Sequence, residues 1–136
     1  MKIKSQPSHV NASIHQLKDF LGDCRNIIHL LPQDQVSDWN AEIDWCSFKV
    51  QAGIIITLVK DENESELNLI RLKSGDKSPF PFKLVIYLEE ENEQTKGYIE
   101  FDGDVNVFLK MMIERPLTNL FNTMTDNLKS YFQDPK

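Results

Sequence analysis

Apolar residues recur in steps of three and four along the last quarter of the chain, residues 105–132. These are the steps that place side chains on one face of an α-helix. Polar residues occupy the opposite face, among them Arg115, Asn119 and Asp126. The apolar stripe consists of Leu109, Ile113, Leu117, Leu120, Met124, Leu128 and Tyr131. The pattern predicts one long C-terminal helix that has one side to bury.

Pro116 lies within this helix and divides its apolar positions into two groups. The groups are Val105, Phe108, Leu109, Met112 and Ile113 before it, and Leu117, Leu120, Phe121, Met124 and Leu128 after it. At 100° per residue, the centre of the second group is rotated by roughly 80–90° from the first. Proline cannot donate to the carbonyl of Met112, so we expect a kink and two segments that touch the sheet with different faces. We expect the bend between Met112 and Pro116 to lie over any cavity, with its freed carbonyl open to water or ligand.

Upstream of the helix, the chain opens with a short strand and two short helices. Residues 2–6 are a strand candidate that ends near Pro7, which cannot donate to a ladder. Residues 11–23 predict a helix with Asn11 or Ser13 as N-cap, and residues 24–32 predict a second helix that stops at Pro32. From Val36 the apolar period changes to two, which is typical of strands. Six strands are predicted there, at residues 36–43, 45–50, 54–60, 66–73, 82–90 and 95–104.

The short connections between these six strands predict an antiparallel meander. Its apolar face and the apolar stripe of the helix are buried together if the sheet curves around the helix. We therefore expect an α+β fold: a seven-stranded curved antiparallel sheet wrapped around a long C-terminal helix, with two short helices after the first strand. At 136 residues the chain fits one domain that spans residues 1–136.

This order of elements resembles the START-like, Bet v 1-like (SRPBCC) helix-grip superfamily, in particular its small bacterial members. The resemblance is carried by HLLP (residues 29–32), the acidic turn FDGDVN (101–106) and KMMIERPLTNLFN (110–122). It spans nearly the whole chain, but it concerns pattern and order rather than catalytic motifs. The resemblance implies a hydrophobic cavity between sheet and helix, used for lipids, sterols, polyketides or plant hormones. Some relatives are cyclases or aromatases and others bind protein clients, and a shared fold does not decide among these activities.

The expected pocket lies between the inward face of the sheet and the long helix. Its apolar candidates are Trp39, Phe48, Leu69, Phe82, Ile86, Ile99, Phe101, Met112, Pro116 and Leu120. Aromatic and methionine side chains can line an adaptable cavity for an apolar ligand. The same side chains can equally fill a closed core, since a cavity costs stability. The sequence leaves both alternatives open.

Arg71 is the polar candidate for this pocket. If Leu69 points inward, Arg71 shares its face and could hold a carboxylate or phosphate head group at the pocket edge. In the alternative register Ile70 points inward and Arg71 faces solvent, and the pattern of this strand fits both.

Phe80 is the candidate for a lid, because it stands between two prolines in the loop SGDKSPFPF (residues 74–82). A stiff loop with an exposed aromatic tip could cover a pocket mouth. The alternative is a turn that is shaped by its prolines and has no further role.

Charge and cysteine content exclude several partners. A formal net charge of −6 disfavours nucleic acid and anionic membrane surfaces, which both need basic patches. No apolar run approaches the roughly 18 residues of a membrane span, and the opening residues lack the apolar core of a signal peptide. We therefore expect a cytoplasmic protein without membrane insertion. Cys24 and Cys46 are expected to be free thiols, and Cys46 a small core residue.

Catalytic chemistry finds little support in the sequence. His9, His15 and His29 share no spacing with a carboxylate that would mark a metal site or a triad. Asp102 and Asp104 flank Gly103 but no EF-hand pattern follows, and capping of the long helix is the expected role of these acids. We expect no catalytic residue, no metal ligand and no cofactor.

The leading hypothesis is the binding of a small hydrophobic or amphipathic molecule, lipid-like or aromatic, between sheet and helix. A cyclase or aromatase is the first alternative, and it would need polar groups that converge in the pocket. A protein-interaction module or a homodimer is the second, because Met111 lies off the apolar stripe and Tyr87 and Tyr98 fall on the outer sheet face. The sequence does not identify the ligand or say whether the cavity is open.

Overall fold

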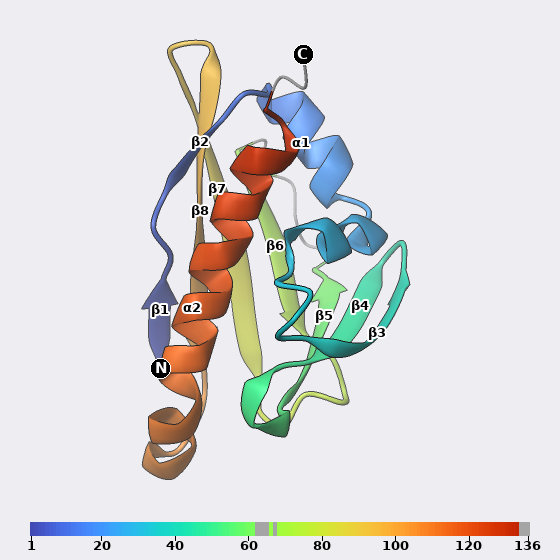
Figure 1. Ribbon diagram of the computed structural model, residues 1–136, viewed down its shortest axis with the longest axis vertical. Coiled ribbons are helices and arrows are strands. Elements are labelled where there is room, and N and C mark those ends of the chain that lie inside the picture. Colours follow the sequence, from blue (N-terminus) through green and yellow to red (C-terminus); the bar gives the residue numbers. More distant parts are fainter. Residues whose placement is uncertain (62–65, 67, 134–136) are drawn as a thin grey trace.

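The chain folds into one antiparallel sheet that curves around a long C-terminal helix (Figure 1). The computed structural model describes residues 1–61, 66 and 68–133. The strands are β1 (Lys2–Lys4), β2 (Ser8–Val10), β3 (Ser37–Glu42), β4 (Trp45–Lys49), β5 (Ile55–Lys60), β6 (Leu69–Ser74), β7 (Phe82–Glu91) and β8 (Gln94–Gly103). The helices are α1 (Ile14–Leu21), the 3₁₀ helices η1 (Cys24–Leu30) and η2 (Gln51–Gly53), and α2 (Val107–Tyr131).

The predicted α+β architecture is confirmed, with one strand more than expected. Within the described residues the strand order is β1-β8-β7-β6-β5-β4-β3, and β2 pairs with β8 beside β1. Both N-terminal strands run along β8, since Lys2 lies opposite Asp102 and Ser8 opposite Gly97. Pro7 stands between them, where the ladder is interrupted. The segment Ser8–Val10 is too short for its period-two pattern to stand out in the sequence.

Strands β7 and β8 form the long hairpin of the sheet. Its strands pair from Phe82 opposite Gly103 to Glu91 opposite Gln94. Asn92 and Glu93 form the turn with positive φ angles of 53° and 69°, the conformation that a two-residue hairpin turn requires. Residues 62–65, most of the acidic loop that the sequence predicts at 61–65 between the strands 54–60 and 66–73, lie outside the described residues.

Side-chain caps fix the starts of the helices. Ser13 accepts a hydrogen bond from the backbone N–H of Gln16 (3.1 Å), and the Gln16 side chain accepts one from the backbone N–H of Ser13 (2.8 Å). This reciprocal capping box decides between the two predicted N-caps in favour of Ser13. The N-cap of α2 is Asn106, whose side chain accepts from the N–H of Leu109 (2.8 Å). The expectation that Asp102 or Asp104 caps this helix is therefore wrong.

The helix α2 is continuous through Pro116 and buries a single stripe. The stripe consists of Ile113, Leu117, Leu120, Phe121, Met124, Thr125 and Leu128. Before Pro116, Val107, Phe108 and Met112 are exposed, so the interpretation that two helix segments touch the sheet with different faces is wrong. The reason is visible in Figure 1, where the first turns of α2 project beyond the end of the sheet. The expected bend at Pro116 stays a prediction.

The interior under α2 is formed by the inward positions of the strands. Leu84, Ile86 and Leu88 of β7 alternate with outward residues, and Ile99 and Phe101 of β8 lie beside them. Cys46 is fully buried in the same core, as predicted, and neither cysteine forms a disulfide.

Candidate functional site

The interior between the sheet and α2 contains most of the predicted pocket residues. Phe48, Phe82, Ile86, Ile99, Phe101 and Leu120 are buried in one continuous apolar core. The rings of Phe82 and Phe101 lie 4.9 Å apart, and the ring of Phe101 lies 5.2 Å from that of Phe121 on α2. Rings at these centroid distances are in direct packing contact, so this end of the interior is filled by side chains.

Phe80 belongs to this packed interior, contrary to the prediction of an exposed lid tip. Its side chain is only 5% exposed, and its ring lies 5.8 Å from Phe82 and 6.3 Å from Phe101. A Cβ atom on Gly103 would come within 3.0 Å of the Phe80 ring, so the absence of a side chain there makes room for it. The Phe80 side chain is therefore part of the core, while Pro79 and Pro81 on either side of it are exposed.

Arg71 lies on the outer face of the sheet. In β6, Ile70 and Leu72 point inward opposite Ile86 and Leu84, which resolves the register that the sequence left open. The Arg71 guanidinium donates to the Glu66 carboxylate at 2.6 Å, and this hydrogen bond raises the pKa of Arg71. Arg71 therefore does not reach the interior.

Leu69 precedes it in β6 and is buried, but it lies outside the main core cluster and opposite Tyr87 of β7. Tyr87 and Tyr98 stack on the outer face with ring centroids 5.0 Å apart, and the Lys4 ammonium lies 4.7 Å from the Tyr98 ring centroid. Such cross-strand pairs stabilise an exposed antiparallel sheet face.

One small crevice reaches the buried side of α2. It has a volume of about 10 Å³, which is room for one water molecule. Its lining is Pro32, Gln35, Val36, Val50, Gln51, Pro116 and Leu120. Two predicted residues, Pro116 and Leu120, thus meet here, while Met112 is exposed and is not part of the lining. Trp39 is half-buried and stacks on Phe48 at 6.3 Å.

The other five lining residues were not among the predicted site residues. Pro32 appeared in the sequence only as the end of the second helix, and Val50 only as a strand position. A turn and a 3₁₀ helix bring them to α2, and neither carries an apolar period that places it in the fold.

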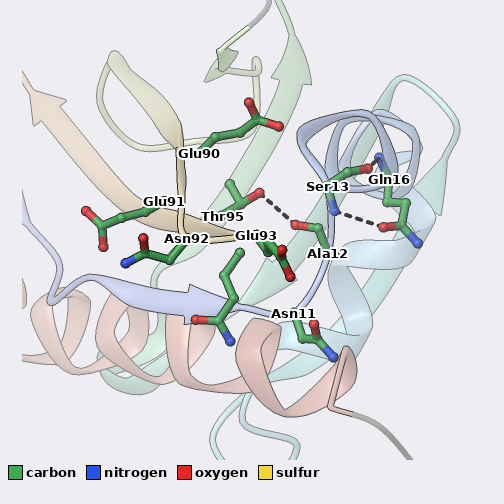
Figure 2. Close-up of a pocket in the computed structure, with 10 residues that line it drawn as sticks. Asn11, Ala12, Ser13, Gln16, Glu90, Glu91, Asn92, Glu93 and Thr95 are labelled. Carbon is green, nitrogen blue, oxygen red and sulfur yellow. Dashed lines mark hydrogen bonds between the residues drawn. The ribbon is translucent and has the colours of Figure 1, made fainter.

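Larger hollows lie on the surface. One of about 530 Å³ lies between the β7–β8 turn and the start of α1 (Figure 2). Several of its polar groups are engaged in structural bonds: Ser13 and Gln16 form the capping box, and the Thr95 hydroxyl donates to the carbonyl of Ala12 (2.7 Å). The Glu91 carboxylate accepts a hydrogen bond from His9 Nε2 at 2.6 Å. A second hollow of about 490 Å³ lies on the outer sheet face between Lys2, Lys83 and Asp102.

Buried polar side chains in the described part of the chain are serines and threonines. Ser5 accepts from the N–H of Ile99 (2.9 Å), Thr125 donates to the carbonyl of Gln6 (3.1 Å), and Ser47 and Thr57 bond each other (3.1 Å). Their hydrogen bonds hold strands and helices together. Within residues 1–61, 66 and 68–133, no three His, Cys, Asp or Glu side chains gather closely enough to hold a metal ion.

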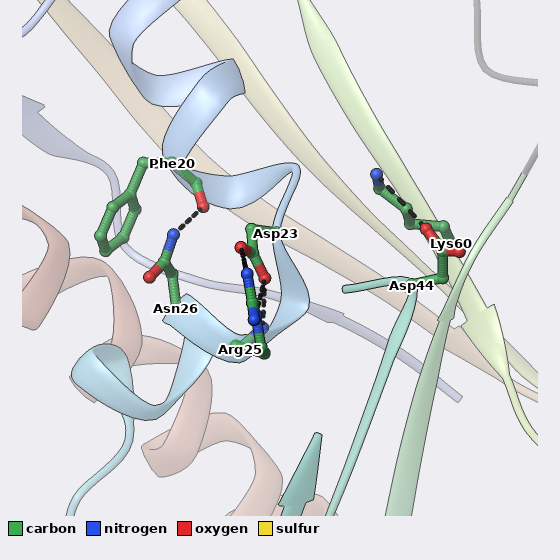
Figure 3. A network of polar contacts seen from close by, with 6 residues as sticks. All are labelled: Phe20, Asp23, Arg25, Asn26, Asp44 and Lys60. Atoms are coloured by element: carbon green, nitrogen blue, oxygen red, sulfur yellow. Dashed lines mark hydrogen bonds and ion pairs between the residues drawn. The ribbon is translucent and has the colours of Figure 1, made fainter. Parts of the chain in front are cut away.

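A polar network joins α1, η1 and the β3–β4 hairpin (Figure 3). Arg25 pairs with Asp23 at 2.7 Å, and the hydrogen bond from Arg25 lowers the pKa of Asp23. The Asn26 amide donates to the carbonyl of Phe20 (2.9 Å), and Lys60 pairs with Asp44 at 3.7 Å. The first two contacts hold η1 and the end of α1 in place, and the third ties the β3–β4 turn to β5.

Comparison with known proteins supports the fold and no specific activity. No family model matches the sequence, and no curated protein matches it. A START superfamily protein from Mycobacterium smegmatis superposes with a TM-score of 0.66 at 10% identity, covering 96% of this chain and 96% of that one. A conserved protein from Geobacillus kaustophilus gives 0.69 at 11% identity, covering 97% and 95%. A protein from Thermus thermophilus gives 0.69 at 11% identity, covering 96% and 95%.

These similarities hold over nearly the whole chain at low sequence identity, so they concern the fold alone. Among the described helices, none is long and apolar enough to cross a membrane. The order of elements, the curved sheet and the helix it encloses agree with the resemblance noted in the sequence. The chain has the START-like helix-grip fold.

Proposed function

We propose that the protein binds a small apolar or amphipathic molecule between the sheet and α2, entering at the crevice beside Pro116. The observation that carries the proposal is the lining of this crevice. Val50 and Leu120 belong both to the lining and to the continuous core, so the crevice borders the apolar interior. As the sequence resemblance implies, relatives with the helix-grip fold hold such ligands between the sheet and the long helix.

The crevice opens if its rim moves. At about 10 Å³ it admits no ligand larger than water, so binding requires the segments around it to shift outward. The hydrogen bonds of these segments are local: Gln35 N–H donates to the carbonyl of Pro32 (2.9 Å), and Gly53 N–H donates to that of Val50 (3.1 Å). Each segment can therefore move as a unit without breaking the sheet.

One bond sets where such a movement pivots. The Asn127 amide donates to the carbonyl of Leu30 (2.9 Å) and ties the end of η1 to the second half of α2. The rim beyond it, from Pro32 to Val36, meets α2 through side-chain packing at the crevice. An outward swing of this rim about the Asn127 contact would open the interior next to Leu120.

The lining also selects the chemical class of the ligand. None of the seven lining residues is ionisable, and the polar ones are the amides of Gln35 and Gln51. These groups suit a neutral apolar ligand with a hydroxyl or amide head. Catalysis is not proposed, because acid–base chemistry needs an ionisable group at the ligand.

The test is a titration of the full-length protein with N-phenyl-1-naphthylamine, an uncharged apolar fluorophore. We expect saturable binding, weakened at least tenfold by Gln51→Trp, which covers the crevice mouth with an indole. The matched control is Gln133→Trp, an exposed glutamine remote from the crevice, which should bind as the wild type does. Absence of saturable binding, or equal binding by both variants, would overturn the proposal.

A further inference from the structure

The first half of α2 carries an exposed apolar patch that neither the core nor the crevice uses. We call it the α2 patch, and its members are Val107, Phe108, Met111 and Met112. Their side chains are 71%, 82%, 76% and 58% exposed. They lie in the first two turns of α2 (Val107–Tyr131), and Figure 1 shows the start of this helix projecting beyond the sheet. Aromatic residues and methionines are the types that are enriched at protein interfaces.

The patch lies on the side of the helix away from the sheet. At 100° per residue, Phe108, Met111 and Met112 are centred about 170° from the buried stripe that contains Ile113 and Leu117. They therefore point away from the interior and cannot line a cavity there. The patch is a separate surface from the proposed ligand site.

The same face of the helix changes character after Pro116. There it carries the polar residues Asn119, Asn122, Asp126 and Ser130. An exposed helix face is expected to be polar along its whole length. The apolar residues are thus confined to the projecting turns, which is the distribution expected of a contact surface.

We propose that the α2 patch is a homodimer interface, in which the projecting turns of two copies pack antiparallel across a two-fold axis between Met111 and Met112. The area agrees with this partner. Four large side chains at these exposures present roughly 500 Å² of apolar surface, at the upper end of the range for a monomer. Complete burial of these side chains in two copies would remove at most about 1,000 Å² from water, which reaches the threshold for a specific interface.

The charges on this face also fit a second copy. Arg115 is exposed and is the charged residue that shares the face with Phe108 and Met112. An antiparallel axis between Met111 and Met112 places Arg115 of each copy opposite Phe108 of the other, where a guanidinium is attracted to the ring face. The two Arg115 side chains start about 10 Å apart along the axis, which limits their repulsion.

A lipid bilayer is the other surface that would cover such a patch, and the charges disfavour it. The positive charges of Arg115 and Lys110 are offset by the negative charges of Glu114 and Asp104 nearby in the sequence. The whole chain carries a net charge of −6. Binding to anionic lipid needs a surplus of cations near the apolar side chains. The symmetric pairing needs no such surplus.

The first experiment is sedimentation velocity on the full chain between 1 and roughly 200 µM, an interval that spans dimer dissociation constants in the micromolar range. We expect a reversible monomer–dimer equilibrium. Met111→Glu should raise the dimer dissociation constant at least 100-fold, because it places a carboxylate on the axis. The matched control is Ser130→Glu, which adds the same charge to the same helix face after Pro116 and should leave the equilibrium unchanged. Both residues are exposed, so neither variant should fail to fold.

A second measurement locates the axis. Met112→Cys should form a cross-linked dimer under mild oxidation, whereas Ser130→Cys should stay monomeric, and the native thiols of Cys24 and Cys46 are buried. A wild-type protein that remains monomeric throughout the concentration range would overturn the proposal. So would a monomer that cosediments with phosphatidylcholine–phosphatidylglycerol vesicles and loses this binding in Met111→Glu, since the patch would then belong to a bilayer.

Discussion

Replacing Phe80 by alanine separates a core role of this loop from a lid role. The ring is 5% exposed and packs against Phe82 and Phe101 over Gly103. Removing a buried phenylalanine side chain costs about 3–5 kcal/mol, and the cost grows when the surroundings cannot collapse. Here the prolines on both sides of Phe80 restrict that collapse. We expect Phe80→Ala to lower the free energy of unfolding by about 3–4 kcal/mol.

The loop around Phe80 is anchored at both ends, which supports this magnitude. The Ser78 hydroxyl accepts from the N–H of Thr57 (2.9 Å), and the carbonyl of Pro81 accepts from the N–H of Asp104 (2.9 Å). A lid that opens for a ligand would have to break these bonds. A mobile lid would also leave the ring in solvent, where its removal costs almost nothing.

The assay is urea unfolding followed by the fluorescence of Trp39 and Trp45. With an m-value of about 2 kcal/mol/M, the expected loss moves the midpoint by roughly 1.5–2 M urea. The matched control is Phe108→Ala, the same substitution at an exposed ring, which should shift stability by less than about 0.5 kcal/mol in dilute monomeric protein. If Phe80→Ala costs as little as the control, the ring is not part of the core and the reasoning fails.

Three further predictions concern Thr95, the two cysteines and Pro116. Thr95→Val keeps the side-chain shape but removes the hydroxyl that donates to the carbonyl of Ala12, so thermal unfolding should show a loss of about 1–3 kcal/mol that Thr95→Ser does not. Burial raises the pKa of Cys24 to about 11 and that of Cys46 still further. Both thiols should therefore resist iodoacetamide at pH 8 in the folded state and react in urea. Because the unfolded thiols ionise first, stability should fall as the pH rises above about 9 towards the folded pKa; rapid native labelling would contradict this. Pro116→Ala restores a helical hydrogen bond and should raise the free energy of unfolding by up to about 3 kcal/mol, seen as a higher unfolding temperature. It should also straighten any bend of the helix in a crystal structure. Unchanged stability would mean that the proline costs the helix nothing.

The architecture could be predicted because the longer elements carry their own periods. The strands from Val36 onward alternate, and the stripe from Ile113 to Leu128 repeats at helical spacing, so both were assigned from the sequence. The register of β6 could not be predicted, since apolar residues occupy both of its faces at Leu69 and Ile70. The register of β6 is decided by the pairing of Ile70 with Ile86 in the neighbouring strand β7. The sequence of β6 alone does not contain this information.

The candidate site was predicted less completely, for a different physical reason. The pattern of apolar positions in a sequence indicates which side chains avoid water, but it does not indicate which part of the fold covers them. Phe108 and Met112 are apolar, as core residues are, but their side chains are exposed. They belong to the start of α2, which projects beyond the sheet in Figure 1. Phe80 has the setting of an exposed turn and is buried, because bonds from Thr57 and Asp104 hold its loop against the core. Both outcomes depend on where distant strands terminate.

Pro116 stands where the two proposals meet. On its buried side it lines the crevice with Leu120, and the residues before it carry the α2 patch. The projecting turns are held to the core chiefly through Ile113, with Leu109 half-buried beside it. A ligand that displaces Leu120 would therefore move a nearly rigid two-turn rod that has few other attachments, and dimerisation would fix that rod in place. If the ligand-bound and free proteins differ in the position of this rod, the factor by which ligand changes the dimer affinity must equal the factor by which dimerisation changes the ligand affinity. A proline at the junction, with one backbone bond missing, lowers the cost of such a displacement at the residue that separates the two surfaces.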